Sequence, residues 1–190
     1  MRILVLGGTR FVGLHVVRAA LEAGHTVDVF SRGRTPAPPG THRLIGDRDG
    51  DLSALDGRWD AVVDVSAYVP RQVRTAAERL SGRAGRYLFV STAAVYDSDA
   101  MPWPIAEDAP LRELSDPTTE RITPETYGGL KVACERQAEA SFDGAVLSVR
   151  PTFVVGPHDY TDRFPYWLRR VRRGGRMAAP IAPDLPLAFV

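Results

Sequence analysis

Residues 2–13 read RILVLGGTRFVG, an apolar run that leads directly into a glycine-rich turn. The run Arg2–Leu6 has the Ile, Leu and Val content of a buried strand, and the pattern over Phe11–Ala23 is helical. Glycines between a strand and a helix allow a tight turn in which a pyrophosphate can approach the free N–H groups of the helix. The stretch therefore predicts a strand–turn–helix unit suited to a dinucleotide.

The candidate pyrophosphate contacts are the residues of this turn: Gly7, Gly8, Thr9, Arg10, Phe11, Val12 and Gly13. The spacing departs from G-x-G-x-x-G, because Arg10 stands at the middle glycine position. A glycine-rich turn without a ligand is the alternative. The place of the turn, directly after the first strand of an alternating pattern, favours the dinucleotide site.

Strand-like and helical patterns alternate along the rest of the chain. The expected strands are nearly continuous in Val, Ile and Leu, as is typical of strands covered on both faces; they are Arg2–Leu6, Thr26–Phe30, Arg43–Ile45, Ala61–Val65, Tyr87–Ser91 and Ala145–Val149. The expected helices are Phe11–Ala23, Pro70–Leu80, Pro124–Phe142, with Thr123 as N-cap, and Asp162–Arg173. This alternation predicts an α/β fold with a doubly wound parallel sheet. The segment Ser98–Pro124 is expected to be a long surface loop that covers a site.

Composition excludes several classes of protein. The 190 residues are 44% hydrophobic and 25% charged, with 24 basic and 23 acidic side chains and a net charge of +1, which gives no general case for binding nucleic acid or a membrane. No apolar run approaches the roughly 18 residues that a membrane span needs, and the first run is too short for a signal peptide. The single cysteine, Cys134, cannot form an internal disulfide, and we expect a cytoplasmic protein. The four histidines show no metal-ligand spacing, so no metal site is predicted.

The end of the second expected strand bears on the choice of cofactor. An NAD site usually has an acidic residue there to hold the ribose 2′-hydroxyl, whereas this chain has Ser31 and Arg32. A hydroxyl and guanidinium groups, with Arg10 nearby, suit a 2′-phosphate, so the sequence favours NADP over NAD. The alternative is that Arg32 and Arg34 are solvated loop residues. Asp47, after the third strand, is a candidate for the adenine edge or an ordinary turn aspartate.

One lysine, Lys131, stands among 23 arginines, and it follows Tyr127 by four residues. On a helix this spacing places both side chains on one face. A nearby cation lowers the pKa of a phenol, which makes Tyr127 a candidate acid or base, with Thr92 or Ser91 as a supporting hydroxyl at a strand end. Two glycines between them, Gly128 and Gly129, suggest close approach of a ligand to the helix.

Four motifs occur in the same order as in a known family: the glycine turn, Ser91-Thr-x-x-Val-Tyr96, Tyr127-x-x-x-Lys131 and Arg150-Pro151-x4-Gly156-Pro157. Together they resemble the extended short-chain dehydrogenase/reductases, the NAD-dependent epimerase/dehydratase family. The residues within these motifs are most similar to its reductase branch and plant chloroplast relatives. The resemblance implies a Rossmann NAD(P)-binding fold and hydride transfer at a carbonyl or hydroxyl carbon. Tyr127 would be the catalytic acid or base, Lys131 would hold the nicotinamide ribose and lower the pKa of Tyr127, and Thr92 would bind the reacting oxygen.

The resemblance also sets limits on substrate and length. Ala93 and Ala94 replace the Asp-Glu of sugar-nucleotide dehydratases, and Phe153 replaces an Asn that contacts sugar nucleotides. Family members are considerably longer, so residues 1–150 are predicted to be the NAD(P)-binding domain and residues 151–190 the beginning of a truncated substrate-binding region. The run Leu187–Val190 looks like the start of a strand. The expected partner is a small-molecule substrate, and a homodimer is one assembly that the sequence allows. The alternative is a non-catalytic NAD(P)-binding regulatory or RNA-associated protein, for which the cluster Arg169–Arg173 is the candidate surface.

Overall fold

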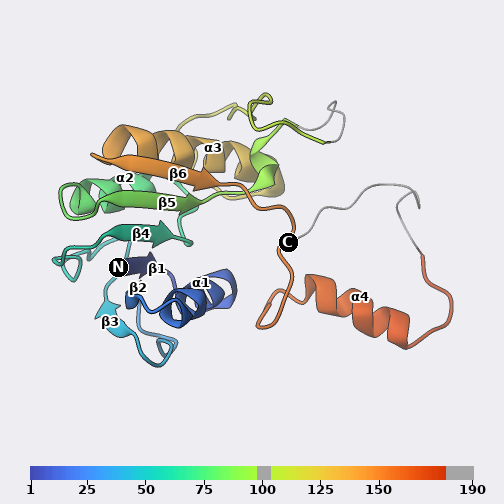
Figure 1. The fold of residues 1–190 in the computed structure, drawn as a ribbon. Coiled ribbons are helices and arrows are strands. Elements are labelled where there is room, and N and C mark those ends of the chain that lie inside the picture. The colour runs from blue at the N-terminus through green and yellow to red at the C-terminus, as the bar shows by residue number, and fades with distance from the viewer. Residues whose placement is uncertain (98–103, 179–190) are drawn as a thin grey trace.

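The computed structural model describes residues 1–97 and 104–178, and within them a six-stranded parallel sheet is the central layer (Figure 1). The strand order is β3-β2-β1-β4-β5-β6, which reverses direction between β1 and β4. The strands are β1 (Arg2–Leu6), β2 (Thr26–Ser31), β3 (His42–Ile45), β4 (Ala61–Asp64), β5 (Arg86–Val90) and β6 (Ala145–Val149). This is the predicted doubly wound order of Rossmann domains, and it places all carboxyl ends of the strands at one edge.

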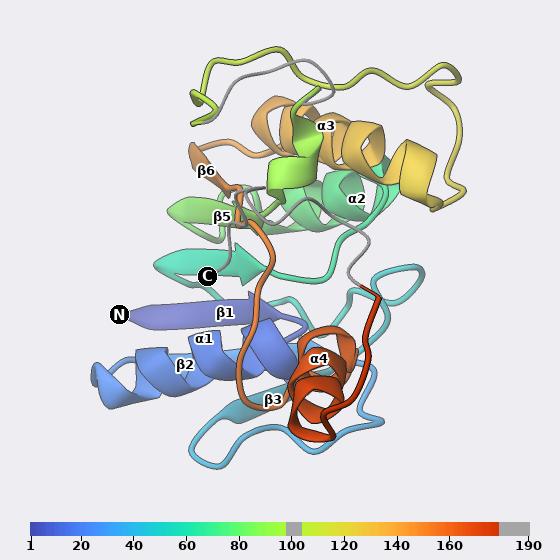
Figure 2. The ribbon, with the colours of Figure 1, turned by 90° about the vertical axis from the view of Figure 1, so that its right-hand side faces the viewer.

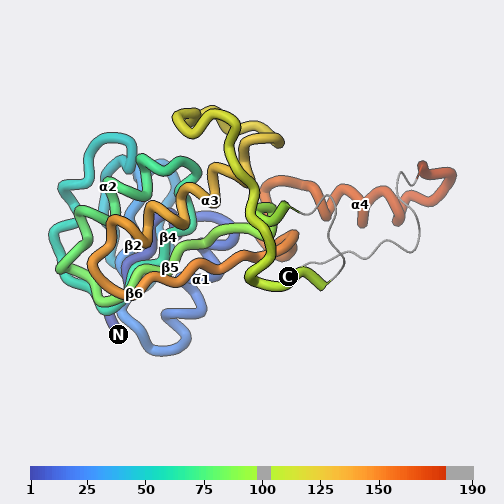
Figure 3. Tube along the Cα trace, turned by 90° about the horizontal axis from the view of Figure 1, so that it is seen from above, coloured from blue at the N-terminus to red at the C-terminus, as the bar shows by residue number. Residues whose placement is uncertain are grey.

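Helices pack on both faces of the sheet (Figure 3). On one face, Ile3 and Val5 of β1 contact Val17 of α1 (Phe11–Glu22). On the other face, a larger core gathers β1, β4 and β5 against α2 (Pro70–Leu80) and α3 (Pro124–Ser141). Successive side chains of a strand point to opposite faces, so each central strand supplies both cores. The remaining elements are the 3-10 turn η1 (Ala93–Val95) and α4 (Arg163–Arg172).

The predicted boundaries differ from the observed ones by at most one residue at each end of the expected elements. The predicted cap of α3 is confirmed: the Thr123 hydroxyl accepts from the Thr126 N–H, and the Thr126 hydroxyl accepts from the Thr123 N–H. The prediction that every strand is covered on both faces is wrong for the two edge strands, β3 and β6. Leu147 is 59% and Val149 41% exposed, because α1 covers β1 and β2 and does not reach the same face of β6.

Two other segments also differ from expectation. Residues 104–123 do not cover the site edge of the sheet; Ile105, Ala109 and Leu111 pack against η1 and α3, and Glu120 pairs with Arg71 of α2. The helix α4 buries none of its residues and lies beside the sheet rather than on it (Figures 1 and 3). The expected strand at Leu187–Val190 lies outside the described residues. No helix in the described ranges combines the length and apolarity needed to cross a bilayer.

Candidate functional site

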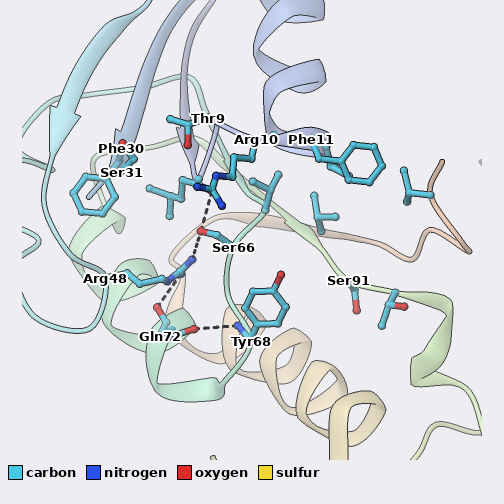
Figure 4. Close-up of a pocket in the computed structure, with 18 of the residues that line it drawn as sticks. Thr9, Arg10, Phe11, Phe30, Ser31, Arg48, Ser66, Tyr68, Gln72 and Ser91 are labelled. Atoms are coloured by element: carbon cyan, nitrogen blue, oxygen red, sulfur yellow. Dashed lines mark hydrogen bonds between the residues drawn. The ribbon is translucent and has the colours of Figure 1, made fainter. Parts of the chain in front are cut away.

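A cavity of about 1110 Å³ opens along the carboxyl ends of the strands, at the point where the strand order reverses. Open α/β sheets bind their ligands at this point. Figure 4 shows side chains of the glycine turn on one side of this space and residues that follow β4 and β5 on the other. Every predicted site residue except Gly8 lines the cavity. Sequence segments that are far apart in the chain therefore contribute to one site.

Two residues of the glycine turn cannot carry a side chain, because atoms of this chain occupy the space that each Cβ would need. Gly7 has φ +93°, and a Cβ there would lie 2.6 Å from the Ser66 Cβ. A Cβ on Gly13 would lie 2.4 Å from the Gly7 carbonyl oxygen. Phe11 adopts φ +36°, a strained value for a non-glycine residue, at the first position of α1. The turn is held in a conformation that its sequence would not otherwise favour.

The N-terminus of α1 offers unpaired amides to this space. Its N-cap residue, Arg10, makes no capping hydrogen bond, and within the described chain the N–H groups of Phe11, Val12 and Gly13 have no acceptor. Free N–H groups and the helix dipole together favour an anion at this end. The arrangement fits the pyrophosphate predicted from the sequence.

Gly8 has a different environment from the one expected. A Cβ there would lie 2.7 Å from the Val17 side chain and 3.1 Å from Val5, inside the core between α1 and the sheet. The structural reason for this glycine is close packing of α1 on β1 and β2. Contact between Gly8 and a cofactor stays a prediction.

The end of β2 turns sharply along the cavity. Gly33 has φ +76°, and its carbonyl oxygen accepts a 2.7 Å hydrogen bond from Arg43. Ser31, Arg32 and Arg34 all line the cavity, as Asp47 does from the loop after β3. Neither Arg32 nor Arg34 is hydrogen-bonded to any described residue, so both guanidinium groups are available to a ligand.

Sequence reasoning missed a buried ion pair in the floor of the cavity. Arg48 donates two 2.8 Å hydrogen bonds to the two carboxylate oxygens of Asp64 and a third of 2.8 Å to the Ser66 hydroxyl. Tyr87 donates to the same carboxylate at 2.6 Å. Burial by itself would raise the pKa of Asp64. Arg48 and Tyr87 have the opposite and larger effect, so the net pKa lies below the usual value for aspartate. The signal in the sequence was Asp64 at the end of the apolar strand β4, because a buried carboxylate needs a partner of opposite charge or a hydrogen-bond donor.

Lys131 is almost fully buried, with 3% of its surface exposed. Its ammonium group donates to the carbonyl oxygens of Ala67 and Val90, both at 2.9 Å, and lies 4.0 Å from the centroid of the Phe89 ring. Burial lowers the pKa of Lys131 to about 8. An ammonium group has three donors, so one remains for a ligand in the cavity.

The pKa of Tyr127 differs from the expectation. Burial raises it above the usual value for tyrosine, against the opposing effects of the Thr92 hydroxyl and the Arg163 guanidinium. The cation that lowers the pKa of Tyr127 is thus Arg163 rather than Lys131, whose ammonium group is held by backbone carbonyls. The structure contradicts the prediction that Lys131 lowers the pKa of this phenol below its usual value.

The glycine pair in α3 has a packing explanation instead of a ligand. A Cβ on Gly128 would lie 2.2 Å from the Ala94 carbonyl oxygen, and one on Gly129 would lie 2.9 Å from Leu114. The glycines let α3 approach the turn after β5, which brings Thr92 next to Tyr127. The nearby Ser91 hydroxyl is buried at the cavity wall, without a hydrogen-bond partner among the described residues. Sequence reasoning had named Ser91 only as an alternative to Thr92.

Comparison with known proteins adds the family. A profile of the NAD dependent epimerase/dehydratase family matches residues 3–184. The chain belongs to this family. An Arabidopsis thaliana relative, chloroplast stem-loop binding protein of 41 kDa b, is 28% identical over 94% of this chain and 49% of its own length. The UDP-glucose 4-epimerase of Azospirillum brasilense is 34% identical over 71% of this chain and 43% of its own length.

Solved structures share the fold. The Bordetella bronchiseptica enzyme WbmG, solved in complex with NAD, superposes with a TM-score of 0.72 at 24% identity, over 93% of this chain and 61% of its own. The chain spans about half the length of the curated relatives it matches. In the described residues of this family member, no three His, Cys, Asp or Glu side chains are grouped to hold a metal ion.

Proposed function

We propose that this chain is the cofactor-binding part of an NAD(P)-dependent oxidoreductase or epimerase that acts at a carbonyl or hydroxyl carbon of a small molecule. The observation that carries the proposal is that Tyr127, Lys131 and Thr92 line the same cavity as the glycine turn. In this proposal residues 1–150 bind the cofactor and residues 151–190 begin the substrate-binding region. A homodimer remains part of the proposal, to be tested by light scattering.

The cavity fits a dinucleotide in volume and in the chemistry of its walls. The amides of Phe11, Val12 and Gly13 would hold the pyrophosphate, Ser31 and Arg32 the adenosine ribose, and Lys131 the nicotinamide ribose. The bound cofactor supplies or accepts the hydride. Asp47 would meet the adenine edge from the loop after β3.

The side chains around Tyr127 account for the proton transfer. Because burial raises the pKa of Tyr127, its hydroxyl keeps its proton at neutral pH and can donate it to an oxygen that gains negative charge. The Thr92 hydroxyl is placed by its bond from the Ala94 N–H, 3.2 Å, and would bind the same oxygen. The Lys131 ammonium would stabilise negative charge nearby.

The test of the catalytic assignment is NADPH oxidation with a panel of carbonyl compounds. We expect Tyr127→Phe to lower kcat/KM by about 100-fold or more, because it removes the proton donor. Tyr166→Phe, at an exposed tyrosine of α4, is the matched control and should leave the rate unchanged. Equal turnover by both variants would overturn the assignment.

We also propose that the cofactor is NADP. The end of β2 presents Ser31, Arg32 and Arg34 to the cavity and no acidic side chain. We expect NADPH to bind more tightly than NADH in a fluorescence titration. Arg32→Ala should remove most of that difference, whereas Arg58→Ala, far from the cavity on the Gly82 carbonyl, should retain it. A preference that survives Arg32→Ala would contradict this role.

A second function, RNA association, is favoured by α4 and by one relative. The helix and the residues after it carry exposed arginines at 169, 172, 173 and 176 beside exposed Tyr166 and Trp167. The name of the Arabidopsis relative records stem-loop binding. A salt-dependent RNA mobility shift that is lost on substitution of Arg169, Arg172 and Arg173 would support this function. The absence of a shift at low salt would exclude it.

A further inference from the structure

The chain after β6 crosses the open edge of the sheet and is attached at both ends (Figure 2). At its start, Arg150 donates hydrogen bonds of 2.7 and 3.0 Å to Glu135 of α3. Further along, the Pro157 carbonyl oxygen lies 2.9 Å from Nε2 of His15 in α1. Residues between and just beyond these two attachments line the cavity, and Phe153 and Arg163 are among them.

Arg163 forms no salt bridge within the described residues, although the Thr161 hydroxyl and the Arg163 charge both contribute to the lowered pKa of the nearby Asp159. Its Nε donates a 3.1 Å hydrogen bond to the Thr161 hydroxyl, and its guanidinium carbon lies 4.7 Å from the centroid of the Phe153 ring. No carboxylate among the described residues forms a salt bridge with it, although the neighbouring Arg169 pairs with Asp162. The stacked guanidinium is oriented by the ring and the hydroxyl, and both Nη groups remain free to donate.

The charge of the cavity near Tyr127 is positive. The lining residues that follow β5 and β6 or lie on α3 include two cations, Lys131 and Arg163, and no aspartate or glutamate. The acidic lining residues, Asp47 and Asp49, belong to the loop after β3 at the other end of the cavity. A ligand part that lies near Tyr127 therefore meets cations and an aromatic wall.

We propose that Arg163 is a specificity-determining residue that binds an anionic group, a carboxylate or a phosphate, of a carbonyl substrate whose apolar part lies against Phe153. Guanidinium groups bind both anions through two parallel N–H bonds, and a lysine at this position would not. This inference rests on the proposed function, because it concerns the substrate of the same site. The effect of Arg163 on the pKa of Tyr127 supports its closeness to the reacting oxygen.

The test uses three aldehydes that differ only in one substituent: 4-carboxybenzaldehyde, methyl 4-formylbenzoate and 4-formylphenyl phosphate. With NADPH, we expect kcat/KM for at least one charged aldehyde to exceed that of the neutral ester by about 10-fold or more. The better of the two charged compounds identifies the anion. In Arg163→Met the ratio of charged to neutral substrate should fall to about 1, whereas Arg172→Met, at the other end of α4, should keep the wild-type ratio.

Binding of compounds that cannot be reduced separates this inference from the proposed function. We expect 4-(hydroxymethyl)benzoate or 4-(hydroxymethyl)phenyl phosphate to bind the wild-type chain about 10-fold more tightly than the methyl ester of the former, and Arg163→Met to lose this difference. If no aldehyde is reduced but this difference exists, the proposed function fails and the anion site stands. A wild-type ratio near 1, or a ratio that persists in Arg163→Met, overturns the anion site. Equal weakening of NADPH and all other ligands in Arg163→Met would show a cofactor contact instead, and would also overturn it.

Discussion

Arg48 and Asp64 form a bidentate ion pair, in which each Nη group donates a 2.8 Å hydrogen bond to a different carboxylate oxygen. Asp64 is completely buried, and Tyr87 donates to it from the other side. The pair joins the loop after β3 to the end of β4, and these two segments meet in the floor of the cavity. The position of Asp47, next to Arg48 in the chain, thus depends on this buried pair.

Removal of either member of the pair should destabilise the fold strongly. We expect Arg48→Met and Asp64→Asn to lower the free energy of unfolding by about 3–5 kcal/mol, because each leaves an uncompensated buried group. Arg83→Met, which breaks a pair with the 75% exposed Asp56, should cost about 1 kcal/mol or less. Urea unfolding at neutral pH measures all three. Similar small losses for the three variants would contradict a structural role of the buried pair.

The same pair predicts how stability depends on acid. The pKa of Asp64 is lowered in the folded chain, so its stabilisation is present above the usual pKa of aspartate and is lost as pH falls through the folded value. In Arg48→Met burial acts on Asp64 without the cation, and the loss should begin at higher pH. Acid unfolding followed by circular dichroism measures the two midpoints. A midpoint that does not rise in the variant would show that Arg48 does not set this pKa.

Gly128 should be intolerant of even one methyl group. We expect Gly128→Ala to destabilise the chain by about 1–3 kcal/mol through overpacking, since the Ala94 carbonyl occupies the space that the Cβ would need. Gly50→Ala is the matched control, because nothing lies within 4 Å of a Cβ there. Thermal unfolding of both variants checks the difference. A stabilised Gly128→Ala would show that the close approach of α3 to the turn after β5 is not required.

Lys131 should titrate more than two pH units below an ordinary lysine. The chain contains no other lysine, so a sample labelled with 13C at lysine Cε gives a single resonance whose titration reports the pKa directly. We expect a midpoint of about 8, because burial disfavours the ammonium form. The folded pKa is below the unfolded one, so the unfolded chain binds more protons between about pH 8 and 10.5, and stability should rise with pH across this range. A midpoint near 10.5 would contradict the burial of the ammonium group.

The sequence predicted the strands and helices well because their signals are local. An apolar run such as Leu4–Leu6 and a cap such as Thr123 with Pro124 depend on adjacent residues, and the structure confirms both. The uncovered face of β6 was not predictable in the same way. Whether Leu147 is covered depends on which helix packs on that face, and nothing in the strand itself contains this information.

Site residues that belong to sequence motifs were predicted. Site features that depend on contacts between distant segments of the chain were missed. The four-residue spacing predicted Tyr127 and Lys131, and the position after a strand end predicted Thr92. The partner of Asp64 lies 16 residues earlier in the chain, in a loop, and the two meet only through the sheet order. The reason for Gly128 was also misjudged, because the carbonyl that occupies its Cβ position comes from Ala94, on a different element.

The pKa of Tyr127 separates the contributions of the two nearby cations. Burial raises this pKa, while the Thr92 hydroxyl and Arg163 oppose the increase. We therefore expect the tyrosinate absorbance of the wild type minus Tyr127→Phe to titrate above the usual value of about 10. Arg163→Met should shift this midpoint upward, since the charged form loses a favourable cation, and Arg172→Met should not. A midpoint below the usual tyrosine value in the chain without cofactor would mean that Lys131 acts on the phenol despite its bonds to Ala67 and Val90. Because a proton donor must keep its proton, the reducing activity should decline in the alkaline range, first as Lys131 loses its charge near pH 8 and then as Tyr127 ionises.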